Sequence, residues 1–142
     1  VRLGRLINTE SAAKLRTQLT RSVVLALREL MRQTQPDNHS RDLAAYISLA
    51  LEEIYQTAET SVAAWEKKGY WVKADRFRMD WEWATRYASS MRSALVNEDW
   101  AGVAMTAAQI AQKLMNVDVP LRHKLGTPWE GAWEQLRKAQ QA

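Results

Sequence analysis

The sequence predicts an all-α protein, an antiparallel four-helix bundle with a short fifth helix at its C-terminus. Gly and Pro are scarce, with 5 and 3 residues among 142, and helix formers such as Ala, Leu, Glu, Gln and Arg fill long windows. Apolar residues recur at spacings of three, four and seven in five segments, as in amphipathic helices, and no segment keeps the alternation of a strand. The expected helices cover residues 8–33, 41–68, 71–96, 99–115 and 128–140 of a single domain, 1–142.

The first two helices have clear ends. Asn8 or Thr9 is expected to cap the first helix, since a side-chain oxygen there can accept from a free backbone N–H. Pro36 should stop that helix, because the residue before a proline avoids helical geometry. The second helix should begin at Ser40 as its N-cap, and Gly69 should end it in a left-handed conformation. Its apolar stripe is the cleanest in the chain: Leu43, Ile47, Ala50, Leu51, Ile54, Ala58, Val62 and Trp65.

The remaining helices differ in how sharply they begin. The third helix has no strong cap near Trp71, because Asp75 is the nearest good capping residue. The fourth helix follows the break at 96–100 and carries its apolar stripe from Trp100 to Leu114. The fifth helix opens with a complete capping box, in which Thr127 is the N-cap, Pro128 is N1 and Glu130 is N3.

Composition narrows the class of protein. Hydrophobic residues make up 46% and charged residues 25%, which is typical of a globular domain. The absence of Cys excludes disulfides, thiol catalysis and zinc–thiolate sites, and it fits the cytoplasmic location that we expect. No apolar run is long enough for a membrane span and no signal-peptide pattern is present, so no membrane association is expected. The chain begins at Val1 rather than Met, which allows for an upstream segment.

Charge is distributed in blocks of alternating sign. Residues 1–41 hold eight Lys or Arg against three Asp or Glu, residues 42–66 hold five acids and no base, and residues 67–92 hold seven bases against three acids. Such blocks favour attraction between neighbouring helices. They do not form one continuous basic surface, and a net charge of +4 is too small to indicate a nucleic-acid binder by itself.

Aromatic residues concentrate in the third helix. Val72, Met79 and Trp83 share one face and are expected in the core, whereas Phe77 and Trp81 lie on another side. Trp81 and Trp83 are about 160° apart and should not share a neighbour. Either this helix is central and covered on both sides, or one side is an interface with a protein partner or a second copy. A Trp-lined pocket is a third alternative. The interface residues that we expect are Trp71, Phe77, Trp81, Trp129 and Trp133.

A basic ridge runs along the first helix, formed by Lys14, Arg21, Arg28 and Arg32. The ordinary interpretation is a solvated face; the functional one is contact with phosphates of a nucleic acid or with an acidic partner. Glu52, Glu59 and Glu66 on the second helix have the same spacing of seven. Antiparallel packing would pair them with the ridge as Arg28–Glu52, Arg21–Glu59 and Lys14–Glu66. The ridge, however, points about 140–180° away from the apolar stripe of its own helix, so the alternative is that the two rows meet through another helix or another subunit. A second basic group lies at residues 67–78.

No motif in the chain indicates catalysis. His39 and His123 lie in expected loops and are not in a metal-ligand spacing, no Ser lies in a nucleophile frame, and no Gly-rich phosphate loop is present. The sequence therefore predicts a non-enzymatic protein without metal or cofactor. Its expected function is to bind a protein partner, or to form a homo-oligomer, through the aromatic face of the third helix. The alternative is a nucleic-acid-associated protein that uses the basic ridge.

Overall fold

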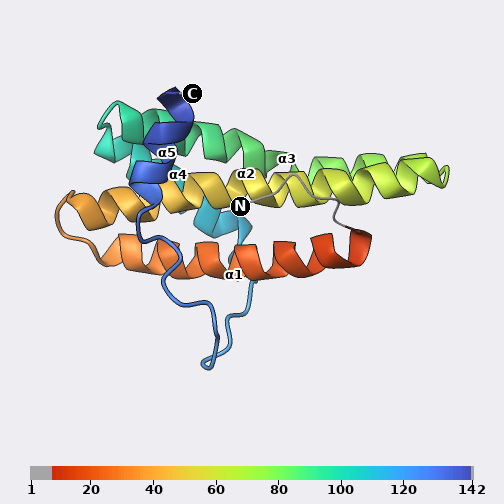
Figure 1. Ribbon diagram of the computed structural model, residues 1–142, viewed down its shortest axis with the longest axis horizontal. Helices are drawn as coiled ribbons and strands as arrows, with labels where there is room; N and C mark the ends of the chain where they lie inside the picture. The colour runs from red at the N-terminus through yellow and green to blue at the C-terminus, as the bar shows by residue number, and fades with distance from the viewer. Residues whose placement is uncertain (1–7, 142) are drawn as a thin grey trace.

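The helices of the protein are those that the sequence predicts in number and order. The computed structural model describes residues 8–141, and no strand occurs in this part of the chain. Its helices form a bundle with a short C-terminal helix (Figure 1), so the predicted fold class is confirmed. They are α1 (Thr9–Arg32), α2 (Asn38–Lys67), α3 (Trp71–Val96), α4 (Trp100–Lys113) and α5 (Ala132–Gln141).

Local side-chain chemistry sets most helix ends. The Asn8 side chain accepts a hydrogen bond from Ser11 N at 2.7 Å and caps α1. Gly69 has a φ of +82° and ends α2 in the predicted left-handed conformation, which residues with a Cβ rarely adopt. Asp99 accepts from Gly102 N at 2.9 Å and caps α4. α3 begins without a side-chain cap at Tyr70, which agrees with its weak start signal.

Two predicted helix starts are wrong. α2 begins at Asn38 and not at residue 41, because Asp37 caps it by accepting from Ser40 N at 2.9 Å. α5 begins at Ala132 and not at residue 128. The Thr127 hydroxyl does contact the Glu130 carboxylate, at 3.0 Å, but Gly131 follows with a φ of +78° and interrupts the turn before a helix can form.

α2 is the central helix of the bundle. α1 and α3 lie antiparallel to it on either side, α4 packs back against the C-terminal part of α3 and also touches α1, and α5 crosses the N-terminal half of α2 (Figure 1). Leu43, Ile47, Leu51 and Ile54 on α2 are fully buried, and burying a side chain of this size contributes about 2 kcal/mol. The interpretation of the third helix as the central one is therefore wrong.

The acidic face of α2 turns toward α3. Arg78 of α3 reaches Glu66 at 3.3 Å and Glu59 at 3.4 Å, and the hydrogen bond that Arg78 donates to Glu66 raises the pKa of Arg78 above its ordinary value. Glu52 accepts from the Thr85 hydroxyl at 2.7 Å. The predicted attraction between oppositely charged blocks thus occurs between α2 and α3.

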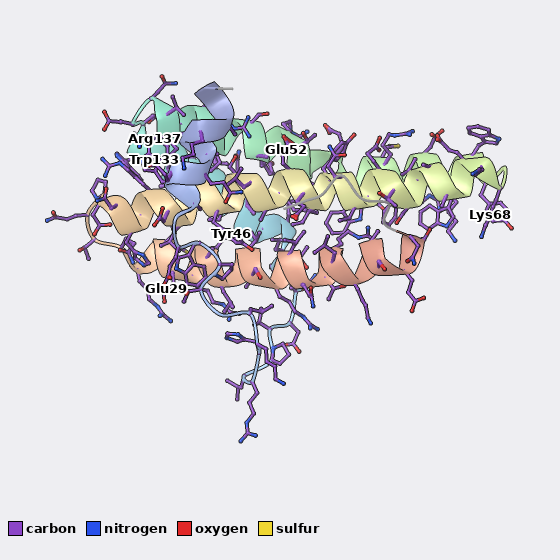
Figure 2. The ribbon with its side chains drawn as sticks, in the orientation of Figure 1. Glu29, Tyr46, Glu52, Lys68, Trp133 and Arg137 are labelled. Atoms are coloured by element: carbon purple, nitrogen blue, oxygen red, sulfur yellow. The ribbon has the colours of Figure 1, made fainter. Side chains whose placement is uncertain are left out.

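The three ion pairs predicted between the basic ridge and α2 are wrong. They assume a turn close to residue 40, whereas α1 ends at Arg32 and α2 starts at Asn38. This displaces the two helices from the assumed register. The three glutamates also lie on a side of α2 that faces away from α1, as Figure 2 shows for Glu52.

Candidate protein-interaction surface

The aromatic residues predicted for the interface do not lie on one surface. Trp71, at the start of α3, is 60% exposed, Phe77, Trp81 and Trp133 are half-buried, and Trp129 is buried. Trp133 lies on α5 near one end of the protein, whereas the turn at Lys68 that precedes α3 lies at the other end (Figure 2). An interface that joins the aromatic residues of α3 to those of α5 is therefore not what this fold presents.

Phe77 and Trp81 belong to a row of packed rings. Trp65 meets Phe77 edge-on at 4.9 Å between ring centroids, Phe77 lies 6.3 Å from Trp81, and Trp81 stacks on Trp83 at 5.9 Å. Trp83 in turn lies 6.1 Å from Tyr87. The contact of Trp81 with Trp83 contradicts the expectation from their angular separation, because an indole is long enough to reach around the helix to its neighbour.

A single arginine of α1 covers the outer side of this row. The Arg16 guanidinium carbon lies 4.9 Å from the centroid of the Phe77 ring and 5.7 Å from that of Trp81. Its Nη1 donates to the Thr57 hydroxyl at 3.3 Å, and burial lowers its pKa from the ordinary value. Cation–π contacts of this kind are worth about 0.5–1 kcal/mol at exposed sites. Phe77 and Trp81 are therefore in contact with a side chain of α1 and do not stand open as anchors.

Trp129 was predicted to lie in the interface, and this prediction is wrong. It is only 7% exposed and packs in the core with Ala132 and Leu136. The Asp42 carboxylate of α2 accepts hydrogen bonds from the backbone N–H of Gly131 at 3.2 Å and of Trp133 at 2.9 Å. These bonds cap the start of α5 from another helix and hold Trp129 inward.

Val72 and Met79 are exposed, although they were predicted to lie in the core. They were expected in the core with Trp83, and Trp83 is indeed buried, but Val72 is 74% and Met79 77% exposed. All three share one face of α3. α4 has 14 residues against 26 in α3, about 21 Å against 39 Å, and it starts beside the C-terminal end of α3. It therefore covers that face only in the second half of α3.

An apolar surface results at the free end of the α2–α3 hairpin. We call it the hairpin-end surface and define it by four exposed residues, Tyr70, Trp71, Val72 and Met79. Two shallow depressions meet at Val72: one is lined by residues 69–73, the other by Val72, Asp75, Arg76, Met79 and Asp80. The hairpin extends beyond α1 in Figure 1, so no helix of the described chain lies over this end.

Sequence reasoning identified Trp71 but missed the rest of this surface. A signal was available in the expected helix lengths. The fourth helix is much shorter than the third. An apolar stripe that continues along the whole third helix must therefore include residues that the fourth helix cannot cover. Val72 and Met79 are the residues of that stripe farthest from the turn into the fourth helix.

The predicted basic ridge is partly occupied by contacts within the chain. Arg32 pairs with Glu29 at 3.2 Å, and Arg21 Nε donates to the carbonyl of Asp118 at 3.2 Å. Lys14 and Arg28 are exposed. The Arg21 contact ties the loop after α4 to the ridge, and this loop projects past α1 in Figure 1. Its residues Arg122, His123 and Lys124 are exposed.

Neither metal-binding geometry nor a membrane span is present in residues 8–141. No group of three or more His, Asp or Glu side chains there is arranged to hold a metal ion. No helix of this part combines the length and the apolar character that crossing a membrane requires. His39 lies in the first turn of α2, 3.8 Å from Glu29, and His123 lies in the exposed loop. No family model, curated protein or solved structure matches the chain, so its function has to be inferred from its own residues.

Proposed function

We propose that this protein is a non-catalytic interaction protein that binds a protein partner or a second copy of itself through the hairpin-end surface. One observation carries the proposal: four apolar side chains lie together, more than half exposed, where two helices project from the bundle. Scattered exposed apolar residues are ordinary, but a contiguous group that includes Trp, Tyr and Met matches the composition of interface centres.

The two helices that carry this surface are held rigidly to each other. Gly69 fixes the turn, Lys73 Nζ lies 4.5 Å from the centroid of the Trp65 ring, and Arg78 ties α3 to two glutamates of α2. A surface on two cross-linked helices loses little conformational freedom on binding, which favours affinity.

Site-specific photocrosslinking tests the proposal. A photoreactive amino acid replaces Trp71 in one variant and the exposed Gln109 of α4 in a matched control, and each variant is expressed in the cells from which the chain derives. We expect a discrete crosslinked product from position 71 only, with both components identified by mass spectrometry. Equal or absent crosslinking at the two positions would contradict the proposal.

Nucleic-acid binding is a second candidate, favoured by the contact between Arg21 and Asp118. This contact ties to the ridge on α1 the loop that carries the exposed Arg122 and Lys124. Binding to phosphates would fall steeply with salt and would weaken in Arg28→Glu, which changes the ridge without releasing the loop. Fluorescence anisotropy with single-stranded and duplex oligonucleotides at rising salt measures this. Affinity that is independent of salt, or equal in the variant, would exclude the ridge as a phosphate site.

A further inference from the structure

The methionines of this chain are exposed to an unusual degree. Met31, Met79, Met105 and Met115 are 60%, 77%, 66% and 74% exposed, whereas Met91 is fully buried. Methionine is ordinarily a core residue, because its apolar and flexible side chain fills irregular gaps. An exposed thioether sulfur is open to oxidation, and the chain has no Cys that would compete for the oxidant. Four of its five methionines are therefore within reach of a dissolved oxidant.

Met79 differs from the other exposed methionines in its position. It belongs to the hairpin-end surface and lines one of the two depressions there, beside Val72. Met31 and Met115 line a different depression, where α1 lies near the end of α4, and Met105 lies on α4. A chemical change at Met79 therefore alters the surface that is proposed for binding.

We propose that Met79 is a reversible oxidation site that controls binding at the hairpin-end surface. This inference rests on the proposed function and adds its regulation. The reagent is a two-electron oxidant of the peroxide class. The sulfur lone pair attacks one peroxide oxygen, the O–O bond breaks and a sulfur–oxygen bond forms. The hydroxide that leaves takes the proton from the oxygen on sulfur and departs as water, so the sulfur is oxidised by two electrons to the sulfoxide and hydrogen peroxide is reduced to water.

The sulfoxide opposes binding because it is polar. The thioether of Met79 is an apolar group that an interface can cover without loss of hydrogen bonds to water. The sulfoxide oxygen is a hydrogen-bond acceptor, and covering it with the apolar centre of an interface removes its water without replacing the hydrogen bond. Methionine sulfoxide reductases, with a thiol as the source of two electrons, restore the thioether. The change is therefore one that a cell can reverse.

The fold does not depend on the Met79 side chain, because most of that side chain is in solvent. Arg78 ties α3 to two glutamates of α2 from another side of the helix. Met91 is the opposite case, since it is 0% exposed and packs in the core, where a peroxide cannot reach its sulfur while the chain is folded. Oxidation of the folded chain should thus change binding and leave stability as it was.

Peptide mapping by mass spectrometry tests the reactivity of the two methionines of α3. The purified chain is treated with dilute hydrogen peroxide, which catalase then removes. We expect Met79 to form sulfoxide roughly tenfold or more faster than Met91, with the helical circular-dichroism signal and its thermal midpoint unchanged. Equal rates at the two residues would overturn the proposal. Unfolding on oxidation that Met79→Leu does not share would assign Met79 to the fold and would also overturn it.

Crosslinking from position 71 tests the control of binding. The chain with the photoreactive amino acid at that position is oxidised, cleared of peroxide with catalase, added to an extract of the source cells and irradiated beside an unoxidised sample. We expect oxidation to lower the yield of the crosslinked product roughly tenfold or more, and reductases for both sulfoxide epimers to restore it. Met79→Leu keeps an apolar side chain without sulfur, so its product should survive oxidation. Met105→Leu is the matched control and should lose its product as the parent chain does.

The outcomes separate this inference from the proposed function. An oxidised chain that crosslinks as well as the unoxidised one, or an equal loss of product in Met79→Leu, would overturn the inference and leave the proposed function standing. If the unoxidised chain gives no product from position 71, the proposed function fails and the inference fails with it.

Discussion

The row of rings on α3 makes a specific prediction for Trp81→Ala. The substitution removes two ring contacts, with Phe77 and Trp83, each worth about 0.5–1.5 kcal/mol, and the cation–π contact with Arg16, worth about 0.5–1 kcal/mol. Since Trp81 is only half-buried, the cavity is open to water and adds little. We expect a loss of about 2–3 kcal/mol in the free energy of unfolding, and a fall in Tm of about 6–9 °C.

Urea unfolding followed by the helical circular-dichroism signal measures this loss without relying on Trp fluorescence. Trp71→Ala is the matched control, because Trp71 is exposed and makes none of the ring contacts; its stability should stay within about 0.5 kcal/mol of wild type. Equal stability of wild type and Trp81→Ala would refute the assignment of Trp81 to the fold. A loss in Trp71→Ala as large as that in Trp81→Ala would refute its assignment to a free surface.

Three further predictions concern other helices. Asp42→Ala removes the capping hydrogen bonds of α5 and should lower the local stability of α5 by about 2 kcal/mol. Amide hydrogen exchange should become faster in α5 and stay unchanged in α3; unchanged exchange in α5 would contradict this. The hydrogen bond from Ser40 N lowers the pKa of Asp37. The ionised Asp37 therefore stabilises the protein fully above pH 3.8, the ordinary pKa of the group, and this stabilisation is lost as the pH falls through the lowered pKa. The Asp37→Asn variant should lose less stability on acidification than wild type, as measured by urea titration at each pH. Burial raises the pKa of Tyr46 above 10.0, so wild type should lose stability as the pH rises past 10.0, and Tyr46→Phe should show a shallower loss.

Features that depend on local chemistry could be predicted from the sequence. Asn8 and Gly69 act on backbone groups within a few residues of themselves, and each begins or ends a helix as expected. The apolar stripe of α2 predicted its buried face correctly. The same helix also carries Ala44, Ala45 and Ser48 in the core, and these small residues beside the stripe were the signal that α2 has neighbours on several sides.

Features that depend on distant segments could not be predicted in the same way. The start of α5 is set by Asp42, which is about 90 residues away in the sequence, and the local capping box at Thr127 gave the wrong position. The exposure of Val72 and Met79 follows from where α4 ends, not from their own spacing. In the candidate site, residue type alone favoured Trp129, although its large apolar ring is as suitable for a core as for an interface.

Binding through the hairpin-end surface is the central claim, and light scattering over a range of concentrations tests directly whether a second copy is the partner. From roughly 10 to 500 µM, a range in which weak association becomes measurable, a self-associating wild type should rise from the 16.3 kDa of one chain toward twice that mass. Met79→Asp, which places a charge on the exposed apolar face, should stay near the mass of one chain. A wild type that keeps the mass of one chain throughout would contradict self-association and leave a different protein as the partner, and a variant that associates equally well would contradict binding through this surface.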